Sequence, residues 1–162
     1  MSKLTVTRPM AIAMGAVLLD QLTKAIVAAL IPLNSGVEIL PFFTLVHVLN
    51  PGAAFSFLSE QPGWQRWLFT VFGLIVSAIL AILIRRNPKA LVSCGYAFII
   101  GGAIANVSDR LWRGAVVDWL DFHIGSLHWP AFNLADSFIF VGVAVLVYAS
   151  FFPTSKAHLE RH

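Results

Sequence analysis

The fold class of this chain is decided by the stretch Trp67-Leu-Phe-Thr-Val-Phe-Gly-Leu-Ile-Val-Ser-Ala-Ile-Leu-Ala-Ile-Leu-Ile84. It holds no charged residue and lies between Arg66 on one side and Arg85 and Arg86 on the other. At a rise of about 1.5 Å per residue, a helix of this length measures about 27 Å, close to the hydrocarbon thickness of a bilayer. The segment therefore predicts a transmembrane helix.

Three further apolar stretches of similar length lie along the chain. Met10 to Ile31 is interrupted only by a few polar residues, and Ala90 to Val107 carries no charge. Ser137 to Phe152 is also uncharged, and it reaches spanning length if its helix starts near Asn133. We predict a mainly α-helical membrane protein of one domain, a four-transmembrane-helix bundle with spans at about residues 10–31, 67–84, 90–107 and 134–152.

The composition agrees with a membrane protein and excludes several other classes. Hydrophobic residues make up 58% of the 162 residues, charged residues make up 12%, and the mean hydropathy is +0.80. A water-soluble domain of this size needs more surface charge. No basic stripe with interleaved aromatic residues is visible, so we expect no nucleic-acid partner. Cys94 is the only cysteine, which rules out an intrachain disulfide and a cysteine-based zinc cluster.

The basic residues predict the orientation of the bundle. They precede span one, fill the turn between spans two and three, and follow span four, so they share one side of the membrane: Lys3, Arg8, Arg85, Arg86, Lys89, Lys156 and Arg161. Basic loops stay in the cytoplasm, so we expect both termini inside. We expect span one to be a retained helix rather than a cleaved signal peptide, because it is long and carries Asp20 and Lys24 in its second half. Arg110 and Arg113 fall on the outer side, and this exception suggests a role in a site.

The outer connection between spans one and two predicts a small β-sheet. Val37 to Leu40 and Phe42 to Leu49 are rich in strand-forming residues, and Asn50-Pro51-Gly52 ends the second run with a turn. We expect a twisted extracytoplasmic sheet formed from about residues 33–65, resting on the outer membrane face. The turn itself has two interpretations, a plain strand end or a backbone that passes close to a bound ligand.

Several polar residues interrupt the apolar sequence at helical spacing. Asp20 and Lys24 are four residues apart on one helix face, either as a pair that neutralises itself or as a brace for polar groups inside the bundle. Asn106 and Arg110 share a face if the third helix continues past its apolar part. Asp109 is expected to pair with a nearby lysine or arginine, or to cap the following turn.

Asp118 and Asp136 are the candidates for chemistry. Ionisable side chains next to a bilayer are costly and usually face a protein interior or a wet cavity. Two neighbouring carboxylates tend to share one proton, which suits peptide hydrolysis because one activates water and the other donates a proton. The alternative is that each caps a helix. Asp121 competes with Asp118 on pattern alone. Zinc and serine hydrolase motifs are absent, so we expect no metal.

Five short motifs in sequence order resemble bacterial lipoprotein signal peptidase, also called signal peptidase II. They are Asp20-Gln-Leu-Thr-Lys24, Asn50-Pro-Gly-Ala-Ala-Phe55, Gly101-Gly-Ala-Ile-Ala-Asn-Val-Ser-Asp-Arg110, Gly114-Ala-Val-Val-Asp118 and Phe132-Asn-Leu-Ala-Asp136. Each is weak alone, but the five together on a four-span chain are specific. Two positions depart from the family pattern, Ala105 in place of glycine and Trp119 in place of phenylalanine, and neither removes a reactive group.

The resemblance implies an aspartic endopeptidase of the bacterial inner membrane, with its active site near the outer face. Its substrate would be a prolipoprotein whose cysteine carries a diacylglyceryl group, cut just before that cysteine. Asp118 and Asp136 become the catalytic pair, which also decides against Asp121. The other motif residues become groups that bind the substrate or support the pair: Asp20, Lys24, Asn50, Gly52, Asn106, Asp109, Arg110 and Asn133. No metal or organic cofactor is implied.

Two other classes of function compete with the peptidase. A small transporter would place polar groups through several spans, whereas here the second span has no charged residue and the polar groups gather towards one membrane face. A non-catalytic assembly protein would use the outer sheet to dock a partner and would not require both Asp118 and Asp136. Membrane lipid is an expected partner, and a monomer is expected because all candidate site residues lie on one chain.

Overall fold

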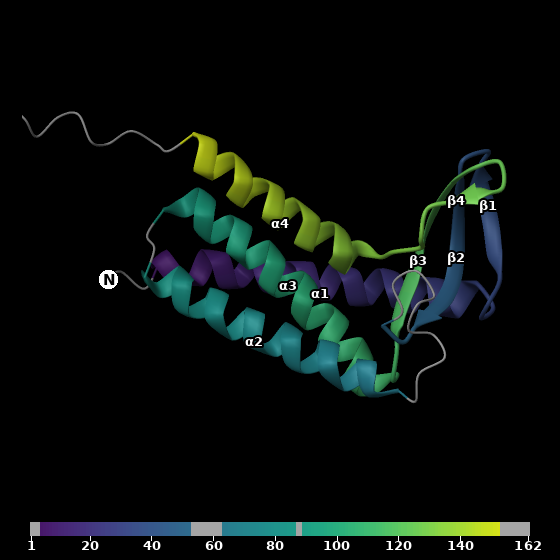
Figure 1. The fold of residues 1–162 in the computed structure, drawn as a ribbon, viewed down its shortest axis with the longest axis horizontal. Coiled ribbons are helices and arrows are strands. Elements are labelled where there is room, and N and C mark those ends of the chain that lie inside the picture. The colour runs from purple at the N-terminus through teal and green to yellow at the C-terminus, as the bar shows by residue number, and fades with distance from the viewer. Residues whose placement is uncertain (1–3, 53–62, 87–88, 153–162) are drawn as a thin grey trace, which may run out of the picture.

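Four long helices and a small antiparallel sheet make up the structure, which is a computed structural model that describes residues 4–52, 63–86 and 89–152 (Figure 1). The bundle predicted from the sequence is confirmed. The elements in chain order are α1 (Leu4–Leu30), β1 (Gly36–Leu40), β2 (Phe43–Asn50), α2 (Trp64–Arg86), α3 (Ala90–Trp112), β3 (Val116–Ile124), β4 (Leu127–His128) and α4 (Leu134–Phe151).

All four helices are long and apolar enough to cross a membrane. Helices α2 and α4 keep most of their apolar side chains on the outside of the bundle, and Phe72 and Phe140 are examples of exposed aromatic residues. This pattern suits a helix whose solvent is lipid, because burial inside the protein gains little over burial in hydrocarbon. Helix α3 is the central one and packs against α1, α2 and α4.

Helix α3 extends further than the apolar run that predicted it. The uncharged sequence stops at Val107, but the helix continues through Trp112 and carries Asp109 and Arg110 in its last turns. These polar side chains do not break the helix because their partners lie inside the protein, as described below. Asn106 and Arg110 therefore share one helix face, as the sequence predicted.

Glycines let α3 approach its neighbours closely. A Cβ at Gly101 would lie 2.8 Å from the carbonyl oxygen of Ala13 in α1, and one at Gly102 would lie 2.2 Å from the carbonyl oxygen of Ala135 in α4. Any larger residue would force the helices apart. The small-residue pattern at Gly101 and Ala105 thus marks close helix packing, and it brings the end of α3 against the start of α4.

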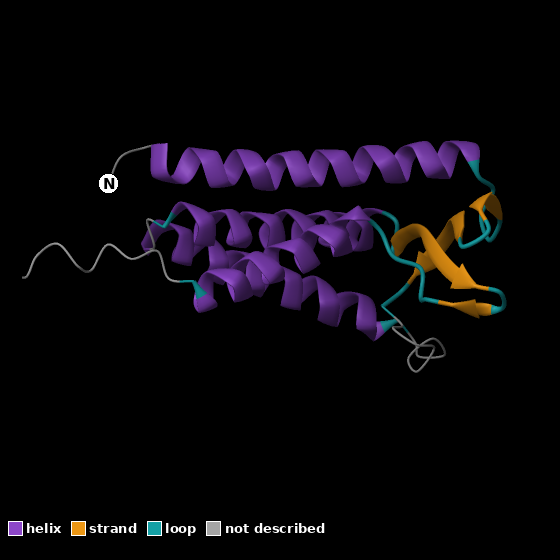
Figure 2. Cartoon of the chain, turned by 90° about the horizontal axis from the view of Figure 1, so that it is seen from above, coloured by secondary structure: helices purple, strands orange, loops and turns teal. Residues whose placement is uncertain are grey.

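The sheet has the strand order β1-β2-β3-β4, with antiparallel neighbours, and lies at one end of the bundle (Figures 1 and 2). The sequence predicted β1 and β2 between the first two helices, but β3 and β4 come from the connection between α3 and α4. Strand β3 was missed because Asp118 and Asp121 interrupt its apolar residues. Residues 53–62, which include the Ala53-Ala54-Phe55 end of one motif, lie outside the described residues.

Both described chain ends lie at the end of the bundle away from the sheet (Figure 1). Helix α2 ends there too, at Arg85 and Arg86, and α3 begins there after Lys89. The polar tail after Phe152, with its lysine, arginine and two histidines, lies outside the described residues. The full length of the helices therefore separates the sheet from Arg85, Arg86 and Lys89.

Candidate active site

Asp118 and Asp136 meet where the sheet joins the bundle. Asp118 lies in β3, and Asp136 lies in the first turn of α4. The linker before α4 is bonded to β3, because Phe132 exchanges backbone hydrogen bonds with Leu120. This pairing places Asn133, the residue that caps α4, directly beside Asp118. The two carboxylates therefore come together through backbone pairing rather than through their spacing in the sequence.

Asn133 contacts both aspartates. Its side-chain Nδ2 donates to Asp118 Oδ1 at 2.6 Å, and its Oδ1 accepts from the backbone N–H of Asp136 at 3.0 Å. Its own backbone N–H donates to Asp136 Oδ2 at 3.3 Å. Asn133 is fully buried, so these bonds compete with no water. One asparagine thus fixes the position of one carboxylate relative to the other.

Asp118 is almost completely enclosed, with 2% of its surface exposed. Besides Asn133, the Asn50 side chain in β2 donates to its Oδ2 at 2.9 Å. The antiparallel register of β2 and β3, which pairs Val48 with Asp118, brings these residues together. Burial raises the pKa of Asp118 to about 7, although the Asn50 bond opposes the shift, and the nearby charge of Asp136 adds to the increase. A carboxyl group with this pKa can carry a proton at neutral pH.

Asp136 is half-buried and takes part in a capping box with Asn133. The predicted alternative, in which each aspartate is a helix N-cap, is wrong, because Asn133 is the N-cap of α4 and Asp118 lies in β3. The capping box nevertheless occupies one oxygen of Asp136. The other oxygen, Oδ1, accepts from Asn106 Nδ2 of α3 at 2.8 Å. Capping and a catalytic role are thus compatible at Asp136, since the helix start also orients the carboxylate.

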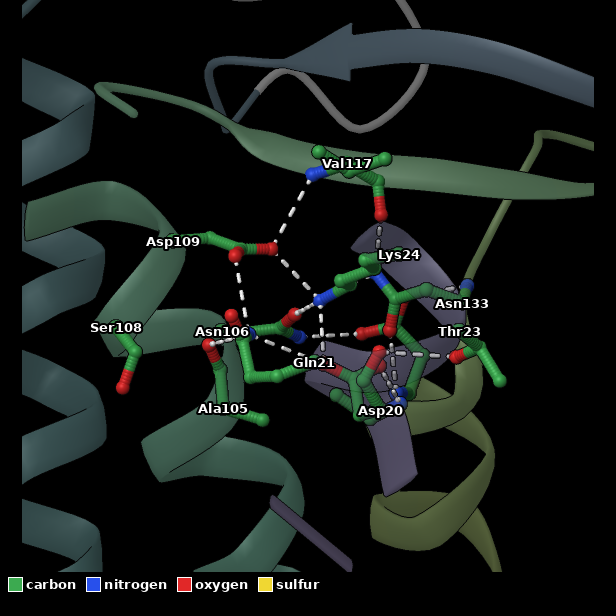
Figure 3. Close-up of polar contacts among 12 residues, drawn as sticks. Asp20, Gln21, Thr23, Lys24, Ala105, Asn106, Ser108, Asp109, Val117 and Asn133 are labelled. Carbon is green, nitrogen blue, oxygen red and sulfur yellow. Dashed lines mark hydrogen bonds and ion pairs between the residues drawn. The ribbon is translucent and has the colours of Figure 1, made fainter. Parts of the chain in front are cut away.

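A buried ionic cluster supports this pair from the side of α1 (Figure 3). Lys24 Nζ lies 2.8 Å from Asp20 Oδ2, 2.8 Å from Asp109 Oδ2 and 3.0 Å from Asn106 Oδ1. Asp20 and Lys24 share one helix face, as predicted, and they point into the bundle. Asp20 Oδ1 also accepts from the backbone N–H of Ala135, so the cluster contacts the first turn of α4.

Asp109 pairs with cations, one of the two outcomes expected from the sequence. It contacts Lys24 and forms an ion pair with Arg113 one turn later, and it accepts from the backbone N–H of Val117 in β3. Arg113, whose position on the outer side suggested a role in a site, thus contacts the ionic cluster through Asp109. Sequence reasoning assigned no role to Gln21, which donates to Asp109 Oδ1 at 3.0 Å and to the carbonyl oxygen of Ala105 at 3.2 Å.

Arg110 approaches the aspartates from the end of α3. Its charge acts on Asp118 and Asp136, and its guanidinium lies 5.3 Å from the centre of the Phe69 ring. Its Nη1 is 3.5 Å from the carbonyl oxygen of Asn106, a long contact. Its buried Nε has no hydrogen-bond partner among the described residues. Arg110 therefore keeps donor capacity next to the carboxylates.

Gly52 closes the turn that follows Asn50. Its φ of 110° lies in the left-handed region, and a Cβ there would lie 2.7 Å from the Phe69 ring. Its backbone N–H donates to Asn50 Oδ1 at 2.9 Å, so the turn fixes the direction of the amide that reaches Asp118. The segment is therefore a strand-ending turn, one of the two interpretations given for it, and this turn also positions a polar group of the site.

Asp121 lies in β3 but does not join the pair. Both of its carboxylate oxygens contact His128 Nδ1, at 2.9 and 3.0 Å. His47 and His123 also have local partners, the carbonyl oxygen of Ile31 and the hydroxyl of Thr44. Within residues 4–52, 63–86 and 89–152, no group of three or more metal-ligating side chains converges.

Comparison with known proteins identifies the family. A family model described as signal peptidase (SPase) II matches residues 12–152. This chain belongs to the signal peptidase II family. A lipoprotein signal peptidase of Aeromonas hydrophila is 52% identical over 143 residues, covering 86% of each chain, and one of Paraburkholderia phymatum is 51% identical over 138 residues, covering 85% of this chain and 83% of the relative. The protein is therefore a peptidase with four membrane-spanning helices.

Solved structures agree with this membership of the signal peptidase II family. A bacterial membrane enzyme superposes with a TM-score of 0.81 at 27% identity, covering 97% of this chain and 95% of the other. A second bacterial membrane enzyme gives a TM-score of 0.79 at 28% identity, covering 92% of this chain and 96% of the other. The bundle and the sheet thus form one arrangement shared with known membrane enzymes.

Proposed function

We propose that this peptidase removes the signal peptide from prolipoproteins whose cysteine carries a diacylglyceryl group, cutting directly before that cysteine. The lipoprotein signal peptidases of Aeromonas hydrophila and Paraburkholderia phymatum support the substrate class, because both are about half identical to this chain over most of its length. The four apolar helices support a lipid-anchored substrate, since a lipidated peptide reaches the enzyme within the membrane.

The catalytic proposal assigns the chemistry to Asp118 and Asp136 as an aspartic pair. The observation that carries it is their shared contact with the buried side chain and backbone of Asn133. Asp118 holds the proton, because burial raises its pKa to about 7. Asp136 then acts as the base, because two neighbouring carboxyl groups share one proton, and it accepts from Asn106 Nδ2 and from the Asn133 backbone N–H. Environments that differ in this way assign the acid and the base.

The reaction then proceeds in two steps, each with two proton transfers. Asp136 removes a proton from water while the water oxygen bonds to the scissile carbonyl carbon, and Asp118 donates its proton to the carbonyl oxygen. In the second step the C–N bond breaks, the leaving nitrogen takes the proton from Asp136, and the carbonyl re-forms as its O–H proton returns to Asp118. The pair ends with one proton, as it began, and no metal or organic cofactor takes part.

The remaining candidate residues bind the substrate or hold the pair. Asn50 and Asn133 orient Asp118, and Asn106 orients Asp136. Arg110 is half-buried at the end of α3 and contacts the substrate backbone through its guanidinium group. Gly52 positions Asn50, and the Asp20, Lys24 and Asp109 cluster fixes the helix ends around the site.

The proposed setting is the bacterial inner membrane, with both termini in the cytoplasm and the active site near the outer face. Arg85 and Arg86 support this orientation, because they end α2 at the end of the bundle opposite the sheet (Figure 1). The protein acts as a monomer in contact with membrane lipid, since every residue of the proposed site comes from one chain.

The test is cleavage of a purified prolipoprotein by the purified peptidase in detergent micelles. The precursor is offered with and without its diacylglyceryl group, and mass spectrometry locates the cut. The proposal is supported if the peptidase cuts only the lipidated precursor and cuts it directly before the cysteine. Equal cleavage of the unlipidated precursor, or a cut elsewhere in the precursor, overturns the assignment of substrate.

A further inference from the structure

Lys24 is a fully buried lysine that directs all of its donors at side-chain oxygens. Its ammonium contacts Asp20 Oδ2, Asp109 Oδ2 and Asn106 Oδ1, all within 3.0 Å. An ammonium group has three donors and no acceptor, so these three contacts use its capacity. Arg113 compensates the second carboxylate by pairing with Asp109. The cluster therefore holds two positive and two negative charges in a fixed arrangement.

Lys24 decides which way the Asn106 amide points. An asparagine side chain has an accepting end and a donating end, and Lys24 can only donate, so Oδ1 must face Lys24. The opposite end, Nδ2, then donates to Asp136 Oδ1 at 2.8 Å. The Asn133 Nδ2 group also approaches Asn106 Oδ1, at 3.4 Å, and favours the same orientation. With the amide reversed, two donors and one carboxylate would each face a group of their own kind.

We propose that Lys24 is a positioning residue for catalysis: through the Asn106 amide it keeps a hydrogen-bond donor directed at Asp136. The proposal rests on the peptidase mechanism above and adds a cause for the difference between the two aspartates. The charged groups around Asp136 are Asp118 from β3, Arg110 from α3, and the Lys24 cluster reached through Asn106. Of these groups, Lys24 is the one that fixes the direction of a donor to Asp136.

A charge-balanced double variant tests the proposal. Lys24→Met together with Asp20→Asn removes one positive and one negative charge and keeps the Asp109–Arg113 pair and an oxygen for the Ala135 N–H. The freed Asn106 amide can then turn. We expect kcat to fall on the order of 10- to 100-fold with KM within about threefold. The acid limb of the kcat profile moves to higher pH, because a carboxylate that loses its donor is protonated more easily.

A double-mutant cycle separates this role from general support of the bundle. Asn106→Ala removes the middle of the relay, so adding the Lys24→Met and Asp20→Asn changes to it causes little further loss of kcat. If Lys24 had a purely structural role, its substitution would lower kcat by the same factor in the Asn106→Ala background as in wild type, and the acid limb of the kcat profile would not move. Asp20→Asn alone shows how much of the loss comes from that position.

The outcomes are decided in one assay. A folded double variant with wild-type kcat and acid limb overturns the proposal, and so do additive losses in the cycle. If the double variant does not fold, Asn106→Ala decides alone, because an unmoved acid limb in that variant refutes the relay. Failure of the wild-type peptidase to cut the lipidated precursor is a separate result, which contradicts the proposed function instead.

Discussion

Replacing Gly102 by alanine should damage catalysis through helix packing alone. The added Cβ would lie 2.2 Å from the carbonyl oxygen of Ala135, whereas ordinary contacts begin at 3.4 Å. Helix α4 must therefore retreat by about 1.2 Å at the residue next to Asp136. Overpacking of this kind costs about 1–3 kcal/mol of stability, and a displacement of about 1 Å at a catalytic group costs on the order of 100-fold in rate. We expect both effects in Gly102→Ala.

The assay compares this variant with two other glycine substitutions. Gly15→Ala lies in α1 with no atom within 4 Å of the new Cβ, so its activity and melting temperature should stay near wild type. Gly142→Ala overpacks the same α3–α4 interface, with its Cβ 2.6 Å from the carbonyl oxygen of Gly95, but lies about 9 Å further along the helix from Asp136. It should lower the melting temperature more than the activity of the folded protein. A folded Gly102→Ala variant with wild-type kcat would refute the reasoning.

Three further predictions concern pH, metals and orientation. Because burial raises the pKa of Asp118 to about 7 in the free enzyme and its proton is needed, kcat/KM should fall as pH rises, with a midpoint near 7; a constant kcat/KM up to about pH 9 would contradict this. Addition of EDTA should leave cleavage unchanged, since carboxylates alone activate the water, and a strong loss would reveal a metal. In intact spheroplasts, a membrane-impermeant maleimide should label Ser126→Cys in the β3–β4 turn but Lys89→Cys only after lysis, and the reverse pattern would invert the proposed orientation.

The helices were predictable because lipid-facing helices reveal themselves by composition. The uncharged run from Trp67 to Ile84 lies within α2, which extends only to Trp64 and Arg86. The end of α3 was not predictable from hydropathy, because Asp109 is charged yet fully buried among partners from α1 and β3. Composition indicates whether a helix faces lipid or water, whereas a buried ionic cluster depends on neighbours that are far away in the sequence.

The sequence named the candidate site residues but not their geometry. The motifs singled out Asp118 and Asp136, yet no spacing rule predicts that Asn133 contacts both. That contact depends on strand β3, which the sequence pattern did not predict because polar residues interrupt its apolar ones. Similarly, the Asp20 and Lys24 pair followed from helical spacing, but the bond from Lys24 to Asn106 joins residues 82 positions apart. Long-range contacts of this kind come from the packing of α1 against α3.

The central claim is that Asp118 and Asp136 act together as the catalytic pair. The most direct measurement is cleavage of the lipidated prolipoprotein by Asp118→Asn and Asp136→Asn, with Asp121→Asn as the matched control on the same strand as Asp118. With all three variants folded, as judged by melting temperature, we predict a loss of at least about 100-fold for each pair member and activity within about threefold of wild type for the control. Near-wild-type cleavage by either pair variant would contradict the account.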